Sequence, residues 1–238
     1  MTIDPRPRPI FVAALEREVA ALVQNWHTDE KLQSSHIHLY WNDDAVIVCA
    51  GMGMHRASLA VEAALQFCPA SELISVGWAG ACNPRLHIGD VVHPTIVIDV
   101  KTGERFFISD PDSTELAEVL VTVATPASAT EKERLAISYY AVAVDMEAAA
   151  VARLARAHDI SFRVIKAVSD ESHFEIPDME QFATPEGQFR EAAFGLHVAL
   201  RPSLWSPVRN MAKSAKLAAE RLQLEIRAHI EESRTRPA

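Results

Sequence analysis

Three acidic residues that lie far apart in the sequence each follow a stretch typical of a buried β-strand. Glu147 and Asp170 come directly after apolar runs, and Glu18 follows the run 10–14 after a few residues. Because ligands of α/β sheets gather at the carboxyl ends of the strands, we expect these three side chains to converge on one pocket. An acid at such a position is also often a helix cap or a surface charge, so position alone leaves both interpretations open.

Converging carboxylates are suited to breaking a glycosidic bond. The transition state carries positive charge on the sugar, which nearby carboxylates stabilise, and a protonated acid can neutralise the charge that grows on the departing group. A serine, Ser169, stands next to Asp170. No Gly-x-Ser-x-Gly turn surrounds it, so we expect Ser169 to form a hydrogen bond to the backbone instead of acting as a nucleophile.

Other chemistries find little support in the residue pattern. His36 and His38 would share one face of a strand, but further metal ligands are missing from the neighbouring sequence, and no metal site is expected. The Gly51-Met52-Gly53 turn is too short to be a dinucleotide-binding fingerprint. The three cysteines form no CxxC pair and are expected to be small buried side chains.

The elements that must position the acids alternate between strands and helices, which implies βαβ units in an α/β fold. Apolar periodicity predicts strands over 9–14, 73–77, 141–144 and 162–168, a β-rich stretch over 89–100, and a hairpin over 36–50. Helices are predicted over 16–22, over 57–65, from a capping box at Thr130, and over 145–158. The small residues 79–81, which follow Trp78, would let the backbone approach a ligand.

The composition indicates one sizeable domain that binds a small molecule. The chain has 238 residues, of which 49% are hydrophobic and 23% are charged, and single α/β domains commonly reach about 200–250 residues. Its net charge of −9 argues against a nucleic-acid partner. The sequence contains no apolar run of about 18 residues and no apolar signal core at its start, so a cytoplasmic location is expected.

A long amphipathic helix is predicted near the C-terminus, over 208–230. Its apolar stripe is expected to pack on its own domain or on a second subunit. A second interpretation is contact with a membrane surface through its basic face and Trp205. The predicted organisation is therefore a flexible segment 1–9, a catalytic domain 10–205, and a C-terminal helix with its tail 206–238.

Five short motifs resemble one known family in the order in which that family carries them. The chain is similar to the purine nucleoside phosphorylase and uridine phosphorylase superfamily, including the methylthioadenosine/S-adenosylhomocysteine nucleosidases. The motifs are Ala14-Leu15-Glu16-Arg17-Glu18-Val19, Gly51-Met52-Gly53, Gly77-Trp78-Ala79-Gly80 with Ile88-Gly89-Asp90-Val91-Val92, Val144-Asp145-Met146-Glu147-Ala148, and Lys166-Ala167-Val168-Ser169-Asp170.

The resemblance implies a role for each acid. Asp170 would protonate purine N7 as the base leaves, and Glu18 would activate the attacking water. Glu147, with Met146 beside it, would hold the ribose hydroxyls. Other residues implied to line the substrate pocket are Gly53, Gly77, Trp78, Ala79, Gly80 and Ser169. The family fold is a three-layer α/β/α domain with a mixed, partly barrel-like central sheet, a homo-oligomer, with no metal or organic cofactor.

Two departures from the family pattern bear on the substrate. Where phosphorylases of the family place an arginine and a serine to hold phosphate, this chain has Ser75 and Trp78, which favours water over phosphate as the nucleophile. Arg56 or Arg85 could still serve phosphate as a co-substrate. The stretch 123–130 lacks the aromatic residue that stacks on adenine in methylthioadenosine nucleosidases, so stacking is expected from Phe106, Phe107 or Trp78.

Two alternatives remain from the sequence. The stretch 123–147 and residues 176–187 resemble a branch associated with hopanoid lipid biosynthesis, which removes adenine from an adenosyl-lipid. A membrane-binding C-terminal helix would suit such a substrate. The other alternative is a nucleoside-binding protein that has kept the fold and lost the activity, because a fold provides a pocket without guaranteeing chemistry.

Overall fold

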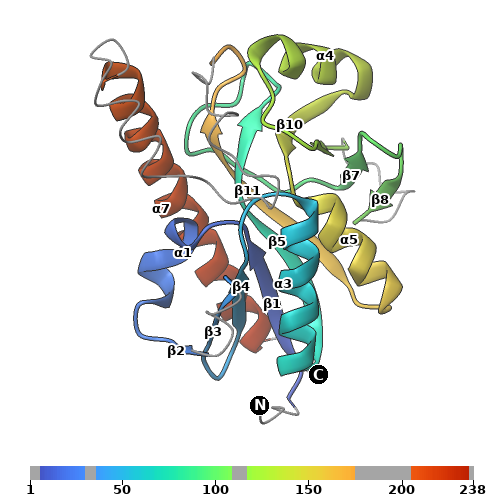
Figure 1. The fold of residues 1–238 in the computed structure, drawn as a ribbon, viewed down its shortest axis with the longest axis vertical. Helices are drawn as coiled ribbons and strands as arrows, with labels where there is room; N and C mark the ends of the chain where they lie inside the picture. Colours follow the sequence, from blue (N-terminus) through green and yellow to red (C-terminus); the bar gives the residue numbers. More distant parts are fainter. Residues whose placement is uncertain (1–5, 30–35, 109–116, 175–204, 236–238) are drawn as a thin grey trace.

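A mixed β-sheet runs through the middle of the molecule, with helices on both of its faces (Figure 1). The computed structural model describes residues 6–29, 36–108, 117–174 and 205–235. The strands in these ranges are β1 (Arg8–Ala13), β2 (His27–Thr28), β3 (His38–Trp41), β4 (Val46–Cys49), β5 (Ala70–Ala81), β6 (Val91–Val92), β7 (Ile96–Asp99), β8 (Arg105–Phe107), β9 (Val119–Thr122), β10 (Ala141–Asp145) and β11 (Phe162–Asp170). The helices are α1 (Glu16–Val23), α3 (Met54–Phe67), α4 (Ala129–Tyr139), α5 (Ala148–Ala157) and α7 (Trp205–Thr235).

The central strand β5 changes its partners along its length. Its first part pairs in parallel with β1, and residues 73–80 pair in parallel with β11. At Gly80 and Ala81 it pairs with β10 in the antiparallel direction. This exchange brings the carboxyl end of β11 and the end of β10 to the same stretch of β5, and it confirms the predicted mixed sheet.

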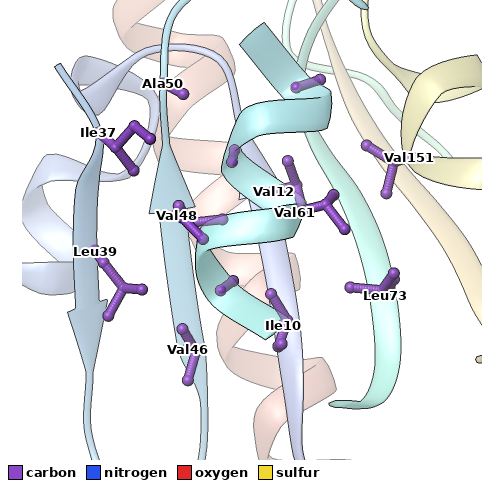
Figure 2. Packing of buried hydrophobic residues seen from close by; sticks show 14 of the residues in the cluster. Ile10, Val12, Ile37, Leu39, Val46, Val48, Ala50, Val61, Leu73 and Val151 are labelled. Carbon is purple, nitrogen blue, oxygen red and sulfur yellow. The ribbon is translucent and has the colours of Figure 1, made fainter. Parts of the chain in front are cut away.

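Apolar side chains on the two faces of the sheet form separate cores. On one face, residues of β1, β3 and β4 pack against α3 and α5, as Figure 2 shows for Val48, Val61 and Val151 among others. On the other face, α1 and α7 cover Phe11, Ile74 and their neighbours. The three layers predicted from the sequence are therefore present, with a helical layer on each side of the sheet.

The long helix α7 is the predicted amphipathic helix, and it packs on its own domain. Ala218, Leu222, Ile226 and Ile230 are buried in the core that α7 shares with α1 and the sheet. Contact of this helix with a membrane or with a second subunit stays a prediction. Among the residues that the structure describes, no helix is long and apolar enough to cross a bilayer.

Several predicted boundaries change in the structure. The sheet begins at Arg8, so the end of the segment predicted as flexible over 1–9 belongs to β1, and α7 begins at Trp205. Residues 78–81, predicted to follow the strand 73–77, continue β5 because β11 and β10 pair with them. The strands β8 and β9 had no counterpart in the prediction, because short segments of three and four residues carry little periodic signal.

Two predicted helix starts are also displaced. The hydroxyl of Ser128, and not that of Thr130, accepts the hydrogen bond of a backbone N–H in the first turn of α4. Asp145 and Glu147 precede α5 instead of lying within its first turn. Asp145 still caps this helix, because its carboxylate accepts a hydrogen bond from the N–H of Ala148 at 2.9 Å.

Candidate active site

Glu18 lies in the first turn of α1, with its carboxylate directed back toward the sheet. One oxygen, Oε2, accepts hydrogen bonds from the N–H groups of Ala14 and Leu15 at 3.1 and 2.9 Å. The other, Oε1, accepts one from the N–H of Trp78 on β5 at 3.1 Å. A carboxylate has about four acceptor positions. With three of them filled by the backbone, Oε1 is left with one lone pair for a further donor.

Glycine at position 77 allows this carboxylate to lie against the strand. A Cβ atom on Gly77 would be 3.0 Å from Glu18 Oε1, and the residue has a φ of +131°, which side-chain-bearing residues rarely adopt. The Glu18 side chain is buried, and burial raises its pKa above the ordinary 4.5, although its backbone donors and Lys166 act in the opposite direction. A carboxyl with a raised pKa accepts a proton more readily than an ordinary glutamate.

Glu147 lies between the end of β10 and the start of α5. Its Oε1 accepts a hydrogen bond from the N–H of Gly53 at 2.7 Å, and Oε2 lies 3.3 Å from the N–H of Met146. Gly53 itself has a φ of +91° and ends the turn before α3. This contact joins two of the motifs that resemble the family, although 94 residues separate them in the sequence.

A buried ion pair, formed by Lys166 and Asp145, lies close to Glu147. The ammonium group of Lys166 is 2.9 Å from Asp145 Oδ2, and both side chains are almost completely buried. Burial raises the pKa of Glu147 to about 7, against the lowering effect of Lys166 and with the support of Asp145. Neither Lys166 nor Asp145 was assigned a role from the sequence, and the signal that could have revealed them is a charged residue inside each of two apolar strands.

Asp170 ends β11 and is held on both of its carboxylate oxygens. The hydroxyl of Ser169 donates to Oδ1 at 2.7 Å, and the ammonium group of Lys132 forms an ion pair with Oδ2. A Cβ atom on Gly80 would lie 2.9 Å from Asp170 Oδ2 and from Lys132 Cε, so glycine is needed there for this pair to form. Lys132, on α4, is the main residue of the site that the sequence prediction missed.

The pairing of β5 with β11 brings the predicted residues together. Gly77, against which Glu18 lies, pairs with Lys166, and Gly80 pairs with Asp170. Three residues of extended chain span about 10 Å, so Glu18 and Asp170 mark two ends of one stretch of β5. Glu147 approaches from β10, which joins β5 at Gly80. Glu18 and the Asp170–Lys132 ion pair therefore lie at opposite ends of this stretch of β5, and Glu147 lies beside the stretch.

The remaining predicted residues contribute in different ways. Ala79 is buried in β5, and its carbonyl lies 3.4 Å from the Ser169 hydroxyl. The backbone N–H of Trp78 donates to Glu18, whereas its ring packs against the core that α1 and α7 share. The Arg17 guanidinium lies over this ring, 5.0 Å from its centroid. Phe106 is buried beneath two arginines, and Phe107 is exposed. The described residues show no cluster of ligands suited to a metal ion.

A groove of about 820 Å³ beside the first half of β11 contains none of the three acids. It is lined in part by His93, Phe107 and Arg163. Its basic residues are largely engaged within the protein, since Arg163 and His229 both bind Glu72, at 2.7 and 2.9 Å. The three predicted acids therefore lie outside this groove.

Comparisons with known proteins agree with the architecture. A family model described as the phosphorylase superfamily matches residues 9–124 and 119–194. The 5′-methylthioadenosine/S-adenosylhomocysteine nucleosidase of Buchnera aphidicola subsp. Baizongia pistaciae is 25% identical over 201 residues, which cover 71% of this chain and 80% of that protein.

Two solved structures share the fold. The apo form of the Arabidopsis thaliana 5′-methylthioadenosine nucleosidase has a TM-score of 0.73 at 20% identity, with 98% of both chains covered. The futalosine hydrolase of Helicobacter pylori has a TM-score of 0.62 at 15% identity, covering 95% of this chain and 98% of that one.

Proposed function

The chain belongs to the phosphorylase superfamily, and we propose that it hydrolyses the N-glycosidic bond of a purine nucleoside, with adenine as the released base. The observation that carries the proposal is the meeting of Glu18, Glu147 and Asp170 along one stretch of β5 and β10. Each acid is held by hydrogen bonds from fixed groups, which gives the preorganised geometry that catalysis requires.

Each carboxyl has a separate task in this reaction. Asp170 gives a proton to purine N7, so that the base departs as a neutral molecule. Glu147 accepts hydrogen bonds from the ribose hydroxyls and stabilises the positive charge that develops on the sugar. Glu18 takes a proton from the water that attacks C1′.

Water is the nucleophile that these surroundings favour. The raised pKa of Glu18 and its remaining lone pair suit a general base for water. A phosphate dianion beside the same buried carboxylate would be repelled unless cations held it. Ser75 is completely buried, and the Arg56 guanidinium already donates to the carbonyls of Ala50 and His36.

The relatives suggest which nucleosides to test first. The Buchnera relative is named for methylthioadenosine and S-adenosylhomocysteine. We extend adenine, the base common to both compounds, to this chain and leave the group at the ribose 5′ position as the variable to be tested. Part of the resemblance to the hopanoid-associated branch lies in 176–187, outside the described residues, and an adenosyl-lipid substrate stays a prediction from the sequence.

One assay separates hydrolysis from phosphorolysis. The purified protein is incubated with methylthioadenosine, S-adenosylhomocysteine, adenosine, inosine and futalosine, with and without inorganic phosphate, and the sugar product is identified by NMR. We expect a free pentose at the same rate in both buffers, fastest with an adenine nucleoside. A pentose 1-phosphate formed only with phosphate would contradict the role given to Glu18.

A further inference from the structure

Lys132 is a lysine of α4 whose side chain is almost completely buried. Its side chain is 1% exposed, although α4 has a polar sequence and its N-terminus is capped by Ser128. The ammonium group forms an ion pair with Asp170 Oδ2 and donates to the carbonyl oxygen of Glu171 at 2.9 Å. Burial of an ammonium ion is costly unless it is paired, so this contact is the reason that the lysine can be buried.

The ion pair determines whether the proton needed for the reaction starts on Asp170 or on Lys132. An aspartate that accepts a hydrogen bond from an ammonium group does not carry the proton itself; the proton is on the lysine nitrogen. The proposed reaction needs a proton at the Asp170 carboxyl when the purine leaves. The hydrogen bond from Lys132 to Oδ2 already joins the two atoms between which that proton would move.

We propose that Lys132 and Asp170 act as one acid, in which Lys132 positions the carboxyl and supplies the proton that Asp170 delivers to the base. This inference rests on the proposed nucleosidase function and deepens it. Lysine suits the task because its ammonium group can lose a proton, whereas a guanidinium group in the same place could not.

The proton and electron balance of the step is complete. The C1′–N9 bond breaks, and its electron pair goes to the purine. One proton moves from the Lys132 ammonium group to the ionised Asp170 carboxylate and from there to N7, which leaves a neutral base, an aspartate and a neutral lysine amine. The attacking water gives its oxygen to C1′ and a proton to Glu18. Solvent then returns a proton to Lys132 and accepts one from Glu18.

Residues of β11, β5 and α4 position the Lys132–Asp170 pair. Ser169 on β11 holds the second carboxylate oxygen at 2.7 Å, which fixes the plane of the Asp170 carboxyl. Gly80 on β5 leaves the space that both side chains occupy. Ser128 starts α4, so that Lys132 lies in the first turns of the helix, next to β11.

The test compares two leaving groups that differ in their need for a proton. Methylthioadenosine requires protonation of its base, whereas 4-nitrophenyl β-D-ribofuranoside releases a stable phenolate without it. Lys132→Met and Asp170→Asn are expected to lose about 100- to 10,000-fold in kcat on the first substrate, as for loss of a general acid, and to keep most of the wild-type rate on the second. Lys216→Met, at an exposed position on α7, is the matched control and should match wild type on both.

Further variants separate a proton source from a fixed charge. Lys132→Arg keeps the charge but cannot release the proton, and it is expected to be as slow as Lys132→Met. The double variant Lys132→Met with Asp170→Asn should be no slower than Asp170→Asn alone, because both changes affect one step. If Lys132→Met does not fold, Lys132→Gln serves in its place, with the nitrophenyl substrate reporting an intact site.

The outcomes separate this inference from the proposed function. Equal losses of Lys132→Met on both substrates, a wild-type rate on methylthioadenosine, or recovery in Lys132→Arg would overturn the role given to Lys132 while leaving the nucleosidase proposal intact. A wild-type protein that cleaves neither substrate nor any nucleoside of the panel would overturn both.

Discussion

At the scale of single residues, the hydrogen bond and the nearby cation of Glu147 offset only part of the cost of burying its negative charge. It accepts a hydrogen bond from Gly53 and lies near Lys166, yet burial together with Asp145 still raises its pKa to about 7. A folded protein that raises the pKa of a carboxyl binds extra protons between the unfolded and folded values, so its stability falls as pH rises through that range. The ionised form that the proposed contact with the ribose requires therefore lowers the stability of the protein.

Glu147→Gln should remove this penalty. Between pH 4.5 and about 7 the wild type is expected to lose more stability than the variant, because the variant lacks this carboxyl, whereas the raised pKa of Glu18 acts in both proteins. The difference should be on the order of 1 to 3 kcal/mol, or several degrees in Tm. Thermal melts at pH 5 and pH 8 measure it, with the exposed Glu133→Gln as control. A gain in Tm that is the same at both pH values, or a loss at pH 8, would contradict the account.

At the scale of elements, α7 connects the C-terminal part of the chain to the site. Leu222 is completely buried in the core shared with α1. The neighbouring Gln223 donates from its side chain to the carbonyl oxygen of Glu18 at 3.0 Å. The helix therefore supports the element that carries the proposed general base.

Leu222→Ala should destabilise the protein by about 2–5 kcal/mol, because it leaves a cavity in a packed core. Leu224 is two residues away on the same helix and 58% exposed, so Leu224→Ala should change stability by less than about 0.5 kcal/mol. Urea unfolding of both variants tests this difference. Equal effects would mean that α7 does not pack on the sheet as described.

The elements also show how far sequence could predict the structure. The ends of β10 and β11 were predictable because an apolar run stops at an acid in each: β11 ends at Asp170, and β10 ends at Asp145, two residues before Glu147. Lys132 was not, because a lysine among Glu131, Glu133 and Arg134 is typical of an exposed helix face. Its burial depends on Asp170 at the end of β11, 38 residues further along the chain.

At the scale of the whole molecule, the change of pairing partners along β5 determines where the proposed catalytic residues lie. The strand pairs with β1, β11 and β10 in turn. The acid that follows β1 and those that follow β10 and end β11 therefore lie near this strand. Gly77 lets Glu18 approach its backbone, and Gly80 does the same for Asp170. Sequence motifs identified these residues, but only the pairing of the strands shows that they meet.

The central claim is that these acids make the protein a purine nucleosidase with Asp170 delivering the proton to the base. The most direct measurement is adenine release from methylthioadenosine in phosphate-free buffer by the wild type and by Asp170→Asn, with circular dichroism to compare their folding. We predict stoichiometric adenine and methylthioribose from the wild type, and a loss of about 100- to 10,000-fold in kcat in a normally folded variant. Adenine release by Asp170→Asn at the wild-type rate would contradict the account.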